Sequence, residues 1–135
     1  MTAQVAIDTN VLVRLLVRDD PSQQAMAQTV LSRFARQPQA VWVPVTVVLE
    51  LEWVLRSRYR LPKSDFVRTL HALMTSIELD FQAEDAMEQA LAYYEDGTAD
   101  FADCLHLALA GQADALPFLT FDAKASRLEG ARLID

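Results

Sequence analysis

The chain has 135 residues, of which 52% are apolar, so we expect a single domain with a substantial core over residues 1–135. It has no apolar run of 18 residues and no basic stretch before an apolar core at its start, which excludes the signatures of a transmembrane helix and a signal peptide. We therefore expect a cytoplasmic protein. The one cysteine, Cys104, excludes an internal disulfide and is predicted to be a core residue, and His106 is expected in the core or on a dimer face.

The charge is distributed unequally along the chain. Its net value is −7, which by itself argues against nucleic-acid binding. Residues 1–70 carry nine Lys/Arg and six Asp/Glu, a net of +3, whereas residues 71–135 carry three and thirteen, a net of −10. On charge alone, two solvated faces of opposite sign are the favoured interpretation, but a local basic face that binds a polyanion stays open.

Short apolar runs alternate with longer helical patterns along the whole chain. The residue Asp20 is the predicted N-cap of a helix because Pro21 follows it at the first helical position. In chain order, the pattern predicts a strand at 4–7, helices at 9–17 and 21–36, a strand at 40–44, helices at 46–59 and 63–75, a strand at 77–80, helices at 83–96 and 100–113, a strand at 117–120, a short helix at 122–128 and a strand at 131–134. Strands that alternate with helices predict an α/β fold with a parallel sheet covered on both faces.

Acidic residues stand near the ends of the predicted strands. Asp8 follows the first strand, Asp122 follows the fourth, and Glu50 lies near the start of the helix after the second. Asp100 and Asp103 begin the helix that leads into the fourth strand, and their i, i+3 spacing makes them neighbours on that helix. Ligands of such folds bind beyond the carboxyl ends of the strands. The five acids can therefore reach one edge of the sheet.

Each of these acids also has a structural explanation, because a carboxylate at a helix N-terminus caps the helix or is stabilised by its dipole. Taken singly, each acid is better explained in this way. Taken together in one pocket they would repel one another, and a divalent cation would remove that repulsion. Oxygen ligands without paired His or Cys point to Mg²⁺ or Mn²⁺ rather than to zinc.

Glu50 has a competitor in Glu52, and the apolar stripe of their helix does not separate them. Glu52 has Arg56 four residues later, in the orientation that favours a surface ion pair. Glu50 has Val54 at that spacing. We therefore expect Glu52 to be a solvated ion-pair residue and Glu50 to belong to the metal site.

Four segments of the chain resemble, in series, the PIN domain and more narrowly the VapC-type toxins of bacterial toxin–antitoxin pairs: AIDTNVLVRLLVRDDP, VPVTVVLELEWVLRSRY, DFADCLHLALA and FLTFD. The resemblance covers nearly the whole chain. It implies a PIN-domain-like three-layer α/β/α sandwich with a central parallel sheet of four to five strands. It also implies a Mg²⁺- or Mn²⁺-dependent endoribonuclease that acts on RNA, pairs with a VapB-type antitoxin and forms a homodimer or a toxin–antitoxin hetero-oligomer.

The same resemblance assigns roles to individual residues. It gives as catalytic acids Asp8, Glu50, Asp103 and Asp122, as metal ligands Asp8, Asp103 and the additional Asp100, and as supporting polar residues Thr9, Asn10 and Thr120. Whether one or two ions act, and whether Asp100 touches the metal directly, stays open at this point.

An acidic pocket repels RNA, so a basic rim would help binding. The candidates for contact with RNA or with an acidic antitoxin tail are Arg14, Arg56, Arg58, Arg60 and Lys63. A solvated, salt-bridged helix end explains the same residues equally well.

Two other functions compete with the nuclease interpretation. An aspartate-dependent phosphoryl-transfer enzyme usually has a second acid two residues after the first and a positioned lysine, but residue 10 is Asn and the first lysine is Lys63. The chain has only three glycines and no glycine-rich phosphate loop. The other alternative is a non-catalytic interaction module of the same fold, in which the acids act only as helix caps.

Overall fold

The computed structural model describes residues 5–35 and 40–135. The chain divides into two compact units, Met1–Gln82 and Ala83–Asp135. The start of the strand predicted at 4–7 and the predicted helix end at Arg36 lie outside the described residues.

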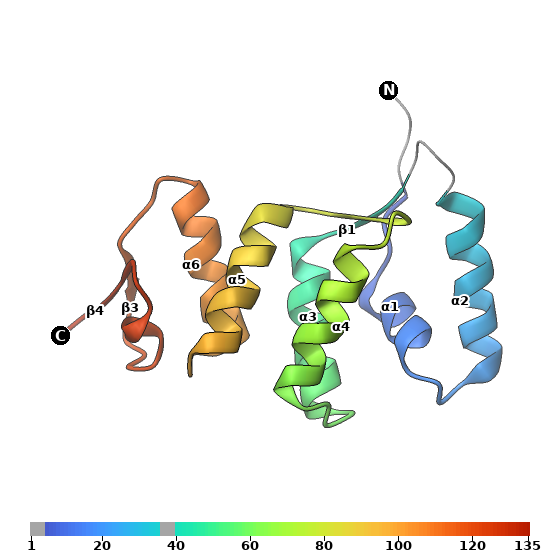
Figure 1. Ribbon diagram of the computed structural model, residues 1–135, viewed down its shortest axis with the longest axis horizontal. Coiled ribbons are helices and arrows are strands. Elements are labelled where there is room, and N and C mark those ends of the chain that lie inside the picture. The colour runs from blue at the N-terminus through green and yellow to red at the C-terminus, as the bar shows by residue number, and fades with distance from the viewer. Residues whose placement is uncertain (1–4, 36–39) are drawn as a thin grey trace. The chain divides into compact units, whose positions relative to one another are not determined.

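The first unit combines helices with a small parallel sheet (Figure 1). Its elements in chain order are α1 (Thr9–Leu16), α2 (Pro21–Phe34), β1 (Val41–Val43), α3 (Val45–Ser57), α4 (Lys63–Met74) and β2 (Leu79–Phe81). The predicted start of α2 is confirmed, because the Asp20 carboxylate accepts a hydrogen bond from the N–H of Gln23 at 3.0 Å and Pro21 occupies the first helical position.

Strand β1 lies at the centre of the sheet in the first unit. It pairs in parallel with β2, with Val41 opposite Leu79 and Val43 opposite Phe81. The segment at residues 5–7 also runs parallel to it, joined by hydrogen bonds from the Trp42 N–H to the Val5 carbonyl at 2.8 Å and from the Ile7 N–H to the Trp42 carbonyl at 3.2 Å. The predicted first strand is thus present as a short paired segment, and it delivers Asp8 to the start of α1.

The core of the first unit is formed by apolar residues that its helices turn inward. Fully buried members include Leu12, Leu51, Phe66 and Leu70, which come from α1, α3 and α4. Burial of such side chains stabilises a fold by about 1.5–3 kcal/mol each. The helices α1 and α3, which carry the first two acids, are therefore fixed against each other by a common core.

The second unit begins with two packed helices and ends with two short strands. Its elements are α5 (Glu84–Asp96), α6 (Phe101–Gln112), β3 (Phe118–Thr120), the 3-10 helix η1 (Ala125–Arg127) and β4 (Ala131–Leu133). Figure 1 shows α5 and α6 side by side, and the rings of Tyr94 and Phe101 meet edge to face between them with centroids 5.3 Å apart. Strands β3 and β4 pair in parallel. Cys104 is fully buried, as predicted.

The described residues form two parallel sheets of two strands each, one in each unit. The α/β class and the order of the predicted elements are confirmed, whereas the predicted central sheet of four to five strands is not. The helix predicted at 122–128 is a 3-10 turn over Ala125–Arg127. Among the helices of the described residues, none is long and apolar enough to cross a membrane.

Candidate active site

Asp8 stands at the N-terminus of α1 with its side chain exposed. Its backbone is extended, and its Oδ1 accepts a hydrogen bond from the N–H of Thr9 at 2.7 Å. The Asp8 carboxylate therefore caps α1, and the positive end of the helix dipole stabilises its charge.

Glu50 lies in the second turn of α3, which begins just after β1. Its Oε1 accepts a hydrogen bond from the hydroxyl of Thr9, a residue 41 positions earlier in the sequence. Thr9 is thus bonded to both acids, through its N–H to Asp8 and through its hydroxyl to Glu50. The first two predicted acids, Asp8 and Glu50, therefore lie close together in the first unit, as expected.

Glu52 forms the ion pair expected for it. The distance between Arg56 Nε and Glu52 Oε2 is 3.7 Å, and this i, i+4 pair lies on the same helix as Glu50. The Glu52 side chain is only 16% exposed, so it is less solvated than the sequence suggested, whereas Glu50 is exposed. The two glutamates have different partners, as predicted: Glu50 accepts a hydrogen bond from Thr9, and Glu52 pairs with Arg56.

Asp100 and Asp103 begin α6 in the second unit. Asp100 is the N-cap residue, although its side chain makes no capping hydrogen bond, and Asp103 lies in the first turn. Burial raises the pKa of the Asp103 carboxyl, and the negative charges of Asp122 and Asp100 raise it further, while His106 acts in the opposite direction. Three acids of the second unit are therefore close enough to feel one another electrostatically.

Of the two positions expected for His106, the core is wrong, while a dimer face stays a prediction. Its side chain is exposed, and its ring lies tilted against Phe118 with centroids 6.1 Å apart. Helix α6 is apolar on most of its surface, so the sequence did not reveal which position faces outward.

Asp122 is held in a turn after β3. Its Oδ1 accepts a hydrogen bond from the N–H of Ala125 at 2.9 Å, and its own N–H donates to Oγ1 of Thr120 at 3.0 Å. Thr120, predicted as a supporting residue, thus fixes the backbone on which Asp122 stands. The Asp122 carboxylate also acts as a cap, because it binds the first N–H of η1.

The predicted acids therefore form two groups, Asp8 with Glu50 in the first unit and Asp100 with Asp103 and Asp122 in the second. Within the described part of either unit, no three acidic, His or Cys side chains gather closely enough to hold a metal ion by themselves. The assembly of all five acids into one site stays a prediction.

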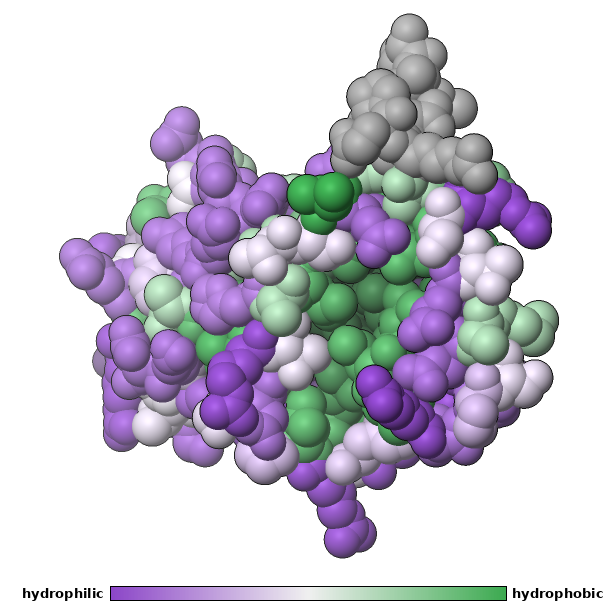
Figure 2. Space-filling model, turned by 45° about the vertical axis from the view of Figure 1, so that its right-hand side comes forward, coloured by the Kyte–Doolittle hydropathy of each residue, from purple (hydrophilic) through white to green (hydrophobic). Residues whose placement is uncertain are grey.

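Asn10 lines a groove between α1 and α2. The groove has a volume of about 290 Å³ and is bordered by Asn10, Val11, Arg14, Gln23, Met26, Ala27 and Val30. Met26 is 64% exposed. Figure 2 shows a face of the molecule on which apolar surface gathers in a hollow bordered by hydrophilic side chains.

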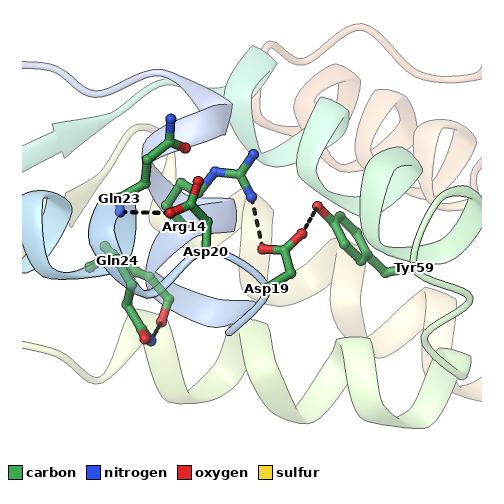
Figure 3. Close-up of polar contacts among 7 residues, drawn as sticks. Arg14, Asp19, Asp20, Gln23, Gln24 and Tyr59 are labelled. Carbon is green, nitrogen blue, oxygen red and sulfur yellow. Dashed lines mark hydrogen bonds and ion pairs between the residues drawn. The ribbon is translucent and has the colours of Figure 1, made fainter.

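Among the predicted basic contact residues, Arg14 and Arg56 make polar contacts within the chain. Arg14 Nη1 lies 2.9 Å from Asp19 Oδ1, and Asp19 also accepts a hydrogen bond from the hydroxyl of Tyr59 at 3.1 Å (Figure 3). Arg56 contacts Glu52 and donates from Nη1 to the Leu61 carbonyl at 3.0 Å. No local pattern predicts the Asp19–Tyr59 contact, because the two residues lie 40 positions apart.

Arg58 and Arg60 are exposed, and Lys63 is partly buried at the start of α4. The two exposed arginines are therefore the members of the predicted basic set that are most accessible to a polyanion.

The PIN-domain profile matches residues 5–131. The chain belongs to the PIN-domain family. The match includes all five predicted acids and both units, and the resemblance seen in the sequence is confirmed. The PIN-domain chain is also similar to the crystal structure of the Mycobacterium tuberculosis toxin VapC20, which is described as a sarcin-ricin-loop-cleaving toxin. That alignment has 18% identity, covers 92% of this chain and 94% of the other, and gives a TM-score of 0.42. A comparison with curated proteins found no match.

Proposed function

We propose that this PIN-domain protein is a divalent-metal-dependent endoribonuclease and the toxin of a VapBC-type toxin–antitoxin pair. The observation that carries the proposal is the PIN match over residues 5–131, which contains every acid that the sequence pattern selected. The motif resemblance to VapC-type toxins supports the narrower assignment to RNA and to an antitoxin.

The residues present fit a hard divalent cation. All the candidate ligands are carboxylates, which Mg²⁺ and Mn²⁺ prefer over nitrogen and sulfur donors. Burial, and then the charges of Asp122 and Asp100, raise the pKa of Asp103, and a cation bound beside this carboxylate would stabilise its charged form. We assign Asp8, Asp103 and Asp100 to hold the ion.

When bound, Mg²⁺ or Mn²⁺ supplies an activated water and neutralises the charge of the scissile phosphate. Glu50 and Asp122 complete the acidic site, where either carboxylate can orient the attacking water. Thr120 supports Asp122 by accepting the N–H of that residue, and Thr9 and Asn10 support the first acid. The reaction is a hydrolysis of an RNA phosphodiester bond without a protein nucleophile.

The partners follow from the same proposal. RNA binds with its phosphates near the exposed Arg58 and Arg60, with Arg14, Arg56 and Lys63 as further contacts. A VapB-type antitoxin covers the site in the cytoplasm, and the toxin assembles as a homodimer or as a toxin–antitoxin hetero-oligomer.

Asp8→Asn and Asp20→Asn form a matched pair that tests the proposal. Both residues cap the N-terminus of a helix through a carboxylate oxygen, and Asn can keep either cap. With a labelled RNA and Mg²⁺ or Mn²⁺, we expect Asp8→Asn to lower cleavage by at least about 100-fold, because even the loss of an outer-shell partner costs about 10–100-fold. Asp20→Asn should cleave RNA like the wild type, and EDTA should stop cleavage by Asp20→Asn and by the wild type.

Equal RNA cleavage by Asp8→Asn and by the wild type would contradict the nuclease proposal. The competing function, a non-catalytic module, is favoured by one observation: the carboxylates of Asp8 and Asp122 both act as caps. Titration with Mn²⁺ separates the two functions, because a protein in which the acids only cap helices would bind no Mn²⁺ that depends on Asp8 and Asp103.

A further inference from the structure

Helix α3 presents its exposed side chains along a single line. They follow one another at intervals of four, three and four residues, at Thr46, Glu50, Trp53 and Ser57. Residues at this spacing share one face of a helix, and the buried side chains of α3 lie on the opposite face. Trp53 is therefore the exposed neighbour, about one turn along the helix, of the proposed catalytic acid Glu50.

The surroundings of Trp53 do not favour a protein partner. Its side chain is 63% exposed, although tryptophan is highly buried on average. The exposed residues beside it on the helix, Glu50 at i−3 and Ser57 at i+4, are both polar. Protein interfaces are built on contiguous apolar patches, and the exposed residues of this face do not form one. A single aromatic ring between polar groups suits a flat ligand with polar edges, and a nucleobase is such a ligand.

We propose that Trp53 binds an unpaired base of the RNA, stacked on its indole ring, beside the phosphodiester bond that is cleaved. Residues three apart on a helix have their Cβ atoms about 5–6 Å apart, a distance that one nucleotide spans between its phosphate and its base. A phosphate held at the acids near Glu50 thus leaves a neighbouring base within reach of Trp53. This inference rests on the proposed nuclease function and adds a specificity-determining residue to it.

Positive charge lies beyond the same helix. Arg58 and Arg60 are exposed and follow the end of α3, where they can bind phosphates while Trp53 binds a base. Tyr59 stands between them in the sequence, but its side chain is partly buried and its hydroxyl donates to Asp19 at 3.1 Å (Figure 3). An RNA strand that lies along α3 therefore meets an acid, the open ring of Trp53 and two cations in that order.

The first test measures RNA binding by fluorescence anisotropy in EDTA, where no cleavage is needed. Its probes are short labelled oligoadenylate and oligouridylate. Trp53→Leu keeps an apolar side chain but removes the ring, so it should weaken oligoadenylate binding by about 5-fold or more, the cost of one lost stack. Trp53→Phe keeps a ring and should stay within about 3-fold of the wild type. Because adenine has the larger face, the wild type should prefer oligoadenylate, and Trp53→Leu should lose most of that preference.

Two control variants separate stacking from other effects. Phe34 is 42% exposed at the end of α2, a helix that carries none of the predicted acids, so Phe34→Leu should bind both probes like the wild type. Arg58→Gln should reduce the slope of log Kd against log salt by about 0.7, as expected for one lost phosphate contact with a single strand. Trp53→Leu should leave this slope unchanged, because a stacked base releases no counterion.

The fluorescence of the indole reports the stack directly. The chain has two tryptophans, the exposed Trp53 and the partly buried Trp42 of β1. A base in contact with an indole ring quenches its fluorescence. Oligoadenylate should therefore quench the wild type and Trp42→Phe, and it should leave the emission of Trp53→Phe nearly unchanged. Should Trp42→Phe not fold, as judged by circular dichroism, the wild type and Trp53→Phe carry the same expectation.

Wild-type affinity for oligoadenylate in Trp53→Leu, an equal loss in Phe34→Leu, or no binding by the wild type would overturn the inference. So would a smaller oligomer of Trp53→Leu than of the wild type in analytical ultracentrifugation without RNA, because Trp53 would then lie between two copies of the chain. Failure of the nuclease proposal is a separate result, since it is read from RNA cleavage by Asp8→Asn with Mg²⁺ or Mn²⁺, whereas binding by the Trp53 variants is measured in EDTA.

Discussion

The two units of the chain hold their acids in different ways. In the first unit, one buried residue, Thr9, donates to both Asp8 and Glu50, and nine Lys/Arg stand against eight Asp/Glu for a net charge of +1. In the second unit, three Lys/Arg stand against eleven Asp/Glu for a net charge of −8, and the pKa of Asp103 is raised by burial and by its acidic neighbours. The first pair of acids is ordered by hydrogen bonds, whereas in the second group burial, and then the neighbouring acids, disfavour the charged form of Asp103.

Within the proposed nuclease function, this difference assigns different roles to the two groups of acids. Acids fixed by hydrogen bonds define where a cation and its water stand. Acids that repel one another gain most when a cation arrives, so they supply much of the affinity. The exposed Arg58 and Arg60 belong to the first unit, so the RNA phosphates are expected to meet the unit whose acids are already ordered.

The largest expected effects come from the cores of the two units, and they test whether the chain unfolds as one domain. Phe66 and Phe101 are buried with 0% and 1% exposure. Phe66→Ala and Phe101→Ala should each lower the free energy of unfolding by about 3–5 kcal/mol. Because the PIN match spans both units, we expect one cooperative transition in wild type and in both variants, measured by urea titration with two spectroscopic probes.

Met26→Ala is the control for these core variants, because Met26 is 64% exposed and its loss should change the free energy of unfolding by about 0.5 kcal/mol or less. The contradicting result would be two separate unfolding transitions, one shifted by Phe66→Ala and the other by Phe101→Ala. Such a result would show that the two units unfold separately and not as a single domain.

A smaller effect should reveal how the buried charge of Asp103 affects the stability of the second unit. Folding raises the pKa of the Asp103 carboxyl, mainly through burial. At pH values between its pKa in the unfolded chain and its pKa in the folded chain, the folded state therefore binds more protons than the unfolded state. Stability should therefore fall as the pH rises through this window, and the ionised Asp103 destabilises the fold above it. In metal-free buffer, Asp103→Asn should raise the melting temperature at pH 7, and this gain should vanish at a pH below the ordinary pKa of aspartate.

Addition of Mn²⁺ should reverse the order of the melting temperatures of the wild type and Asp103→Asn. Wild type should gain melting temperature because a bound cation stabilises the ionised acids, while Asp103→Asn should gain less. The exposed Glu88 of α5 offers the control Glu88→Gln, which should respond to pH and Mn²⁺ as wild type does. A gain in Asp103→Asn that is equal at low and neutral pH would show that the charge of Asp103 is not its cause.

The sequence predicted the order of helices and strands because that order depends on local signals. Helix α2 begins at Pro21 because Asp20 caps it, as its residue types indicated. The segment after Asp122 was predicted as a helix, but the Asp122 carboxylate binds the N–H of Ala125 and closes a turn that continues only as η1. The central sheet depends on pairing between distant strands, which apolar periodicity does not encode.

The site was predictable in its acids and not in the contacts that orient them. Composition and position at strand ends selected Asp8 and Glu50, and the ion pair of Glu52 with Arg56 followed from i, i+4 spacing. The bond from Thr9 to Glu50 spans 41 positions and forms only when α1 packs on α3. No local pattern predicts such a contact, so it became visible only in the folded chain, although the family resemblance had named Thr9 as a supporting residue.

The smallest expected effects concern backbone strain, which also occurs in both units. Arg60 of the first unit and Ala83 of the second have left-handed backbones, with φ of 55° and 53°. This region is unfavourable by about 1–2 kcal/mol for residues with a Cβ, whereas glycine adopts it freely but loses about 0.4–1 kcal/mol through greater freedom in the unfolded chain. Arg60→Gly and Ala83→Gly should therefore each raise the free energy of unfolding by about 0.5–1 kcal/mol, or about 2–4 °C in melting temperature.

Ala92→Gly gives the strictest control for Ala83→Gly, since the chemical change is the same and only the backbone differs. Ala92 is exposed in the interior of α5, the helix that begins just after Ala83, and glycine there should lower the free energy of unfolding by about 1 kcal/mol. Opposite signs for the two variants in thermal unfolding would assign the effect of Ala83→Gly to its φ. Equal signs would show that Ala83 stores no strain.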